Sequence, residues 1–111
     1  MKLKKTVATL SALAQETRLR IFRELVKSHS PDQNLGGLPP GILTKKLNVS
    51  ASTLSFHLKE MNNAGLINSR REGQSIIYKA DLTAMQSLIE TLLNDCCGGA
   101  CGVTVEEQDD A

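Results

Sequence analysis

Cysteine is missing from most of the chain and is clustered where it occurs. Residues 1–95 contain none, and all three cysteines stand in the run Cys96-Cys97-Gly98-Gly99-Ala100-Cys101. An odd number leaves one thiol unpaired, and adjacent cysteines bridge only with strain, so a disulfide scaffold is not expected. The run has no Cys-x-x-Cys spacing, and no nucleophile with a neighbouring base is visible, which argues against a small thiol redox protein or another enzyme.

Aromatic residues and long apolar runs are also scarce. Phe22, Phe56 and Tyr78 are the only aromatic side chains, so the core is expected to be aliphatic. No apolar run reaches the roughly 18 residues of a membrane-spanning helix, and the lysine-rich start lacks the features of a signal peptide. We therefore expect a cytoplasmic protein with no membrane partner. Its 111 residues form one small domain that is marginal as a monomer, which favours a homodimer.

Acidic residues are few in the first 80 positions. This part carries all 13 Lys and Arg and only five of the 12 acids, a net charge of +8, whereas the remainder has seven acids and no cation. A basic body suits the binding of a polyanion through phosphate contacts and counterion release. An ordinary solvated surface would show the same totals, so the positions of the charges must decide.

The first half of the chain predicts three helices. Apolar residues spaced 3, 3 and 1 apart indicate the first two helices, and the Pro39-Pro40 pair can open a third over residues 41–47. Residues 28–40 form a long breaker between the second and third helices. The apolar stripes are Val7, Leu10, Leu13 and Ala14 in the first helix, and Leu19, Phe22, Leu25 and Val26 in the second.

The fourth helix is predicted to read DNA. Ser50 can cap it, and Ala51, Leu54, Leu58 and Met61 form one buried stripe. Its other faces carry short polar side chains with a lysine behind them, which suits a helix that brings its N-terminal residues to base edges in a major groove. His57 lies off the buried stripe, so we interpret it as a phosphate or base contact rather than a core residue.

A hairpin over residues 66–79 and a final helix complete the domain. We expect Arg70, Arg71 and Gly73 at the hairpin tip, where the arginines can reach the flanking DNA. Asp81 or Thr83 can cap the final helix, whose broad apolar stripe is expected to pack on the first helix and on the same helices of a twofold mate. The candidate dimerisation residues are Val7, Leu10, Leu13, Leu82, Met85, Ile89 and Leu92. The candidate DNA-binding residues are Ser50, Ser52, Thr53, Ser55, Phe56, His57, Lys59, Lys45, Lys46, Arg70, Arg71 and Gln74.

Several motifs in this order resemble the ArsR/SmtB family of metalloregulatory winged-helix repressors. The matching stretches are residues 10–22, Leu54-Ser55-Phe56-His57-Leu58-Lys59, Ala64-Gly65-Leu66-Ile67 and residues 71–78. The resemblance implies a mainly α fold with a β-hairpin wing, homodimerisation, and binding to a palindromic operator. It divides the chain into a winged helix-turn-helix and dimerisation domain, 1–95, and a cysteine site with an acidic, flexible tail, 96–111.

The resemblance also implies an effector. The arsenic-responsive members often use a Cys-x-Cys motif before the recognition helix, which is absent over 41–47, and the zinc-sensing members use a histidine on the last helix, which is absent too. The C-terminal run instead resembles variant arsenic repressors, which implies that Cys96, Cys97 and Cys101 bind As(III) or Sb(III), with no organic cofactor. Three soft thiolates suit a three-coordinate metalloid, whereas structural zinc wants four ligands. Sensing of Zn(II), Cd(II) or thiol oxidation, and an inert trio of buried cysteines, remain alternatives.

Overall fold

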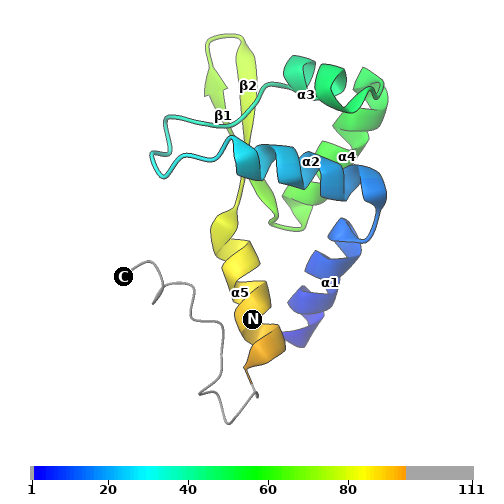
Figure 1. Cartoon of the computed structure of the whole chain (residues 1–111), viewed down its shortest axis with the longest axis vertical. Helices are drawn as coiled ribbons and strands as arrows, with labels where there is room; N and C mark the ends of the chain where they lie inside the picture. The colour runs from blue at the N-terminus through cyan, green and yellow to red at the C-terminus, as the bar shows by residue number, and fades with distance from the viewer. Residues whose placement is uncertain (1, 95–111) are drawn as a thin grey trace.

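The computed structural model describes residues 2–94, and in that part it is a winged helix-turn-helix (Figure 1). The element order is helix, helix, helix, helix, strand, strand, helix, as predicted. The elements are α1 (Leu3–Leu13), α2 (Glu16–Lys27), α3 (Pro40–Leu47), α4 (Ala51–Asn63), β1 (Ile67–Glu72), β2 (Ser75–Ala80) and α5 (Leu82–Leu93). None of these helices is both long and apolar enough to cross a membrane.

Local capping explains where several helices begin. The Ser50 hydroxyl accepts a hydrogen bond from the Thr53 amide at 3.2 Å, as the sequence predicts for the start of α4. Asp81, rather than Thr83, caps α5 by accepting from the Ala84 amide at 3.2 Å. Pro40 opens α3, because its missing N–H falls in the first turn where no helical partner exists.

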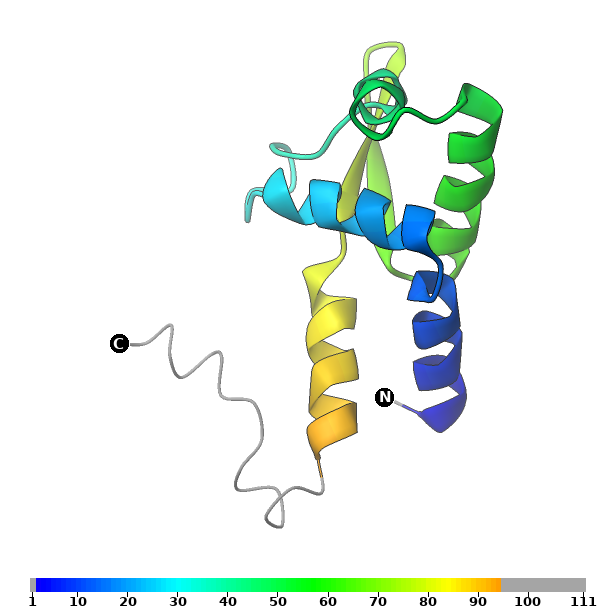
Figure 2. The ribbon, with the colours of Figure 1, turned by 45° about the vertical axis from the view of Figure 1, so that its right-hand side comes forward.

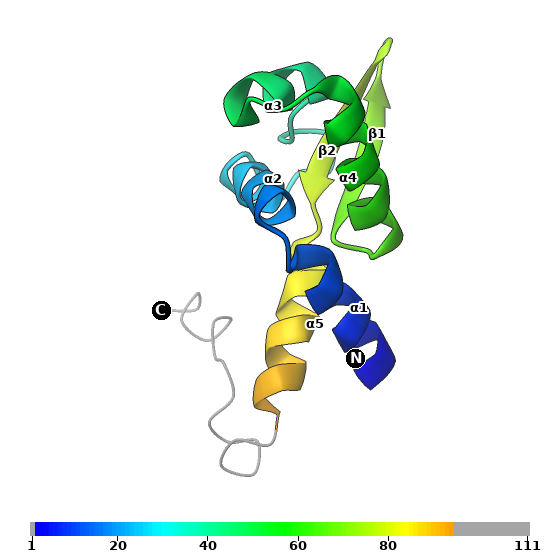
Figure 3. The same ribbon diagram turned by 90° about the vertical axis from the view of Figure 1, so that its right-hand side faces the viewer.

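The core lies between α2, α3, α4 and the foot of the hairpin, while α1 and α5 extend side by side below it (Figures 2 and 3). It is aliphatic, as expected from the scarcity of aromatic residues. The most deeply buried side chains include Ile21 and Leu25 of α2, Leu43 of α3, and Leu54 and Met61 of α4. This packing fixes α4 against α2 and α3 and leaves its opposite face exposed.

The face predicted for the second helix is partly wrong. In α2, Phe22 and Leu25 are buried as predicted, but the third core residue is Ile21, whereas Leu19 and Val26 are 45% and 40% exposed. Leu19 and Val26 lie at one edge of the apolar face of α2 and Ile21 lies at the other, and the spacing of apolar residues alone does not say which edge is covered.

In α1 the buried face is formed by Thr6, Thr9 and Ala12, and Val7 and Leu10 are exposed. Threonine can face the interior there because its hydroxyl donates to the carbonyl four residues earlier, at 3.0 Å for Thr6 and 2.9 Å for Thr9. Val7 and Leu10 of the apolar stripe therefore lie outside the core of their own chain, whereas Leu13 packs against it.

The loop between α2 and α3 is fastened to the hairpin. Leu38 forms a β-bridge with Tyr78, and Lys79, a residue that is only 7% exposed, donates through its ammonium to the carbonyls of Ser30 at 3.4 Å and Asp32 at 3.1 Å. Gly37 has φ = 88°, and a Cβ there would lie 2.6 Å from the Tyr78 carbonyl oxygen. This segment is a built connection between α2 and the wing, the hairpin of β1 and β2.

Candidate nucleic-acid interface

The outward face of α4 carries the polar stripe that the sequence predicted. Ser52, Ser55, Phe56 and Lys59 are all exposed and follow one another at spacings of 3, 1 and 3, which places them on one side of the helix. The opposite side carries the buried Leu54, Leu58 and Met61. A stripe of hydroxyls, one aromatic ring and one cation can donate, accept and make apolar contact with base edges and phosphates.

The two remaining hydroxyls at the start of α4 contact each other. The Ser50 hydroxyl donates to Thr53 Oγ1 at 2.9 Å, in addition to accepting from the Thr53 amide. Both side chains are exposed. They stabilise the first turn of the helix, the part that enters the groove first in a helix-turn-helix.

The structure does not place His57 on the outward face. The residue is only 6% exposed, and its Nδ1 accepts a hydrogen bond from Nε of Arg18 at 3.0 Å. The prediction that His57 faces DNA was wrong about its position, because a residue off the apolar stripe can still be covered by a neighbouring helix. Here the start of α2 covers it.

Arg18 is the functional candidate that the sequence reasoning missed. Besides its bond to His57, its guanidinium carbon lies 5.8 Å from the centre of the Phe56 ring, and the Phe56 and His57 rings meet edge to face at 5.6 Å. Phe56 itself is 57% exposed. Arg18 and His57 are 39 positions apart, so no local pattern joins them; only the fold does.

The surroundings of His57 disfavour its charged form. Burial removes water from the imidazole and lowers its pKa below the ordinary value of 6.5, and the nearby Arg18 guanidinium lowers the pKa further. Because Arg18 Nε–H can only donate, Nδ1 must be unprotonated, and the proton of neutral His57 is on Nε2.

Two lysines flank the α4 face, and both are exposed in the last turn of α3. Lys45 makes no ion pair within residues 2–94. Lys46 Nζ lies 3.9 Å from a carboxylate oxygen of Glu24, too far and too exposed to hold it firmly. Both lysines are therefore free of firm ion pairs within residues 2–94, and their contact with phosphates stays a prediction.

The wing treats its two arginines differently. Arg71 and Gln74 are exposed near the tip, which is the Gly73-Gln74 turn. Arg70 is not at the tip: its guanidinium donates to the carbonyls of Leu35 at 3.3 Å and Gly36 at 2.9 Å, and to Glu72 Oε2 at 2.8 Å. Successive side chains of a strand point to opposite faces, so Arg70 turns to the α2–α3 loop while Arg71 turns away from it.

The candidate dimerisation residues fall into two groups. Val7, Leu10 and Leu92 are 54%, 42% and 57% exposed and lie on the neighbouring helices α1 and α5. The others are half-buried, and three of them pack on the core of the chain itself. The half-buried residues are Leu13, Leu82, Met85 and Ile89.

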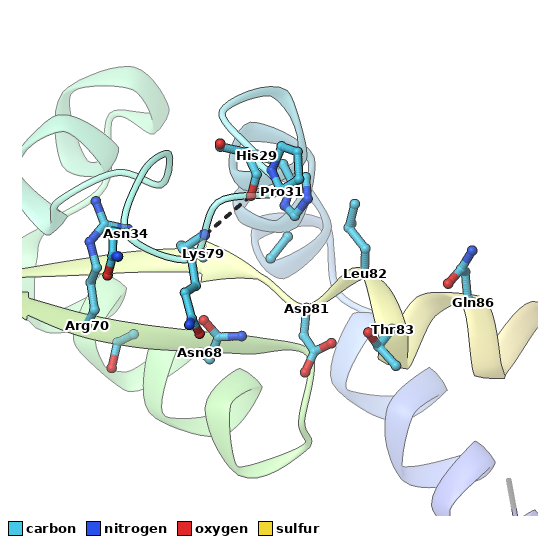
Figure 4. A pocket seen from close by; sticks show the side chains of 14 residues that line it. His29, Pro31, Asn34, Asn68, Arg70, Lys79, Asp81, Leu82, Thr83 and Gln86 are labelled. Atoms are coloured by element: carbon cyan, nitrogen blue, oxygen red, sulfur yellow. Dashed lines mark hydrogen bonds between the residues drawn. The ribbon is translucent and has the colours of Figure 1, made fainter. Parts of the chain in front are cut away.

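A polar cavity of about 630 Å³ lies away from α4, between the α2–α3 loop, the hairpin and the start of α5 (Figure 4). Its charged side chains are already engaged: Lys79 and Arg70 donate to loop carbonyls, and Asp81 caps α5. One buried atom in its lining, Nδ1 of His29, has no hydrogen-bond partner within the described residues. The cavity therefore lies where the loop, the hairpin and α5 meet, and its charged groups are already bonded within the chain rather than free to bind DNA.

The predicted cysteine site, Cys96, Cys97 and Cys101, lies outside the described residues. Between residues 2 and 94, no three His, Cys, Asp or Glu side chains lie close enough to hold a metal ion. What the structure positions is therefore the outward face of α4 and helix α5, the element that precedes the cysteine run.

Fold and surface together define a winged helix-turn-helix DNA-binding protein. The family described as "Helix-turn-helix domain" matches residues 13–70. Among curated proteins, the transcriptional activator HlyU of Vibrio cholerae is 35% identical, over 79% of this chain and 74% of that protein. The regulator YgaV of Escherichia coli K12 is 39% identical, over 81% and 84%. The transcriptional repressor SdpR of Bacillus subtilis is 30% identical, over 75% and 83%.

Solved structures agree with the curated relatives. An ArsR-like regulator from Rhodococcus sp. RHA1 has a TM-score of 0.68 at 26% identity, covering 80% of this chain and 76% of that one. HlyU of V. cholerae has a TM-score of 0.65 at 33% identity, over 87% and 99%, and its reduced form has 0.62 at 31%, over 84% and 90%. The chain belongs to the ArsR/SmtB family of DNA-binding transcriptional regulators, and it is not an enzyme.

Proposed function

We propose that this protein is an arsenic-responsive repressor that binds operator DNA as a homodimer and leaves it when As(III) or Sb(III) binds Cys96, Cys97 and Cys101. The observation that carries the proposal is a position: the chain's only thiols begin two residues after Asn94, where α5 has just ended beside α1. A regulator of this kind works where the DNA is, so we place it in the cytoplasm.

Exposed apolar side chains support the homodimer. Leu3, Val7 and Leu10 of α1 are 76%, 54% and 42% exposed, and Leu92 and Leu93 of α5 are 57% and 39% exposed. These five residues lie on two helices that run side by side, so a second copy could cover both helices at once (Figure 2). A contact between identical surfaces is what twofold symmetry requires, and a domain this small gains core from it.

A twofold dimer presents two α4 helices to one duplex. Such dimers bind half-sites about one helical turn apart, so we propose a palindromic operator read by the exposed stripe of α4. Lys45, Lys46 and Arg71 would contact phosphates beside it, which fixes position rather than sequence. Blocking of transcription follows from occupancy of the operator.

The donor set supports the choice of effector. Thiolates are soft ligands, and three of them satisfy a pyramidal metalloid without a fourth donor. Because the cysteine run directly follows α5, a ligand held there acts on the end of a helix that carries Leu92 and Leu93. A coupling free energy of about 1 to 3 kcal/mol between effector and DNA would weaken operator binding roughly 5- to 150-fold.

The test is operator affinity under reducing conditions, measured by fluorescence anisotropy with and without arsenite. We expect arsenite to weaken DNA binding by wild type and not by Cys97→Ser. Asp109→Asn, a change in the same segment that removes no thiol, is the matched control and should respond like wild type. An equal response of Cys97→Ser and wild type would overturn the assignment of the thiols.

A thiol-oxidation sensor is the second candidate. One observation favours it: reduced HlyU is among the structures that this chain resembles at more than 30% identity. Hydrogen peroxide added in place of arsenite distinguishes the two, since an oxidation sensor releases DNA with oxidant and is indifferent to arsenite in the presence of reductant. Zn(II) and Cd(II) form a third arm of the same experiment.

A further inference from the structure

The contact between Arg18 and His57 joins the start of α2 to the middle of the DNA-reading helix. Arg18 Nε donates to His57 Nδ1 at 3.0 Å, and the same guanidinium lies over the ring of Phe56 at 5.8 Å. Phe56 is the aromatic member of the exposed α4 stripe. One arginine thus contacts both the buried and the exposed side of α4.

This hydrogen bond exists in only one protonation state of the histidine. Nδ1 can accept only while it carries no proton, and a second proton on the ring would place two cations about 3 Å apart in a buried site. Protonation therefore removes the bond and sets Arg18 against His57. The geometry makes the contact a switch between two arrangements of one side-chain pair.

We propose that Arg18 is a positioning residue that holds α4 ready for DNA by donating to neutral His57, and that protonation of His57 breaks this contact and weakens DNA binding. The inference rests on DNA reading by α4 and not on arsenic sensing. Its assays contain no arsenite, so the two can fail separately.

The other charged groups nearby give the released arginine an alternative. The hollow of about 340 Å³ beside Arg18 is lined by Ala8, Ser11 and Ala12 of α1, which carry no charge, and by Glu60, Asn63 and Ala64. Glu60 is the carboxylate of that lining and lies one turn after His57 on α4. A guanidinium repelled by His57 can turn to Glu60 and away from Phe56.

The sign of the pH effect distinguishes this inference from the simpler hypothesis that His57 contacts phosphates directly. A histidine that contacted phosphates would gain charge in acid and bind DNA more tightly. Here the histidine must lose its proton before the complex forms, so affinity falls in acid, by up to about tenfold per pH unit for each subunit once free His57 is protonated. Its lowered pKa places the fall below pH 6.5.

The experiment measures affinity from pH 8 to pH 5 for a duplex that wild type enriches from a random-sequence pool at pH 8. Wild type should lose affinity below pH 6.5. His57→Asn should not, because its amide oxygen can accept from Arg18 and cannot be protonated. His29→Asn changes the chain's other histidine and should behave like wild type. Arg18→Met should bind weakly at every pH and lose the acid-dependent fall.

A spectroscopic measurement keeps the test independent of any variant. The ring ¹⁵N shifts of His57 in the full chain at pH 8 should show the proton on Nε2 and a bare Nδ1. A proton on Nδ1, or wild-type affinity that is constant or rises in acid, would overturn the proposal. Failure of wild type to bind any duplex at pH 8 would overturn it together with the DNA-binding function.

Discussion

Arg70 and Arg71 are neighbours in the sequence, but alternation along β1 turns them to different surroundings. Arg70 donates to two loop carbonyls and to Glu72, so its charge is largely committed within the chain. Arg71 is exposed and makes no ion pair among the described residues. Of the two, Arg71 is the residue that can release a counterion when DNA binds.

We predict different salt dependences for the two glutamine variants. Arg71→Gln should reduce the slope of log affinity against log salt concentration by about 1 for each subunit of the bound dimer, because each subunit loses one phosphate contact. Arg70→Gln should leave the slope nearly unchanged and should instead loosen the loop over residues 28–38, visible as faster amide exchange. If Arg70→Gln reduced the slope as much as Arg71→Gln does, Arg70 would have to leave the loop to contact DNA.

Prediction from sequence succeeded at the residue scale where the cause is local. The Ser50 cap depends on residues three positions apart, and the exposed stripe of α4 depends on one helical period. The prediction for His57 failed because the environment of this side chain is set by Arg18, which belongs to another helix. Periodicity describes one helix at a time and cannot report what covers it.

Among the elements, the α2–α3 loop was predicted only as a breaker and proves to be an ordered connection to the wing. Its glycines are needed for conformation: Gly37 has φ = 88° and approaches the Tyr78 carbonyl closely. Gly41, in α3, has open space around its Cβ position. Gly37 is therefore required by the backbone conformation, whereas Gly41 can be replaced.

Alanine at the two glycines should therefore have opposite effects. Gly37→Ala should lower the free energy of unfolding by roughly 1 to 3 kcal/mol, because an L-residue is strained at that φ and its Cβ meets the strand. Gly41→Ala should raise it by about 0.5 to 1 kcal/mol, since alanine favours the helix and meets nothing. Urea unfolding measures both, and a harmless Gly37→Ala would contradict the close packing of loop and wing.

Helix α1 shows why element positions were easier to predict than element faces. Its bounds follow from the residues themselves, but threonines line its buried side and leucine and valine its exposed side. The sequence predicted that its apolar stripe meets the last helix and the same helices of a twofold mate. The monomer's core uses the threonine side, which leaves the leucine side for a partner.

A charge on the exposed side of α1 should separate the subunits. The Leu10→Glu variant should be monomeric at micromolar concentrations at which wild type is a dimer, because its carboxylate would be buried in the interface without a partner. Ala8→Glu adds the same charge on another exposed face of α1 and should leave the dimer intact. Sedimentation velocity decides; a dimer that tolerates Leu10→Glu would place the interface elsewhere.

For the molecule as a whole, stability should depend on pH through His57. Its pKa is lowered in the folded state, so between pH 6.5 and that lower value the unfolded chain binds the extra proton and the folded chain does not. The free energy of unfolding should thus be full above pH 6.5 and decrease in more acidic solution. Urea unfolding of wild type and His57→Asn at several pH values should show this decrease in wild type alone.

The sequence predicted the architecture of residues 2–94 well, because helix periods, caps and the hairpin turn are local signals in a family order. It could also name the cysteine run, since three thiols are conspicuous in a chain with no others. Dimer geometry and long-range pairs such as Arg18 with His57 depend on surfaces that meet only after folding.

One titration tests the central claim most directly. The dimer, bound to its operator under reducing conditions, is titrated with arsenite while DNA release and arsenic bound per subunit are followed together, the latter by native mass spectrometry. We predict that release follows arsenic binding and is complete near one arsenic per subunit, and that a variant with all three cysteines changed to serine does neither. Release without bound arsenic, or arsenic bound while the DNA stays in place, would contradict the account.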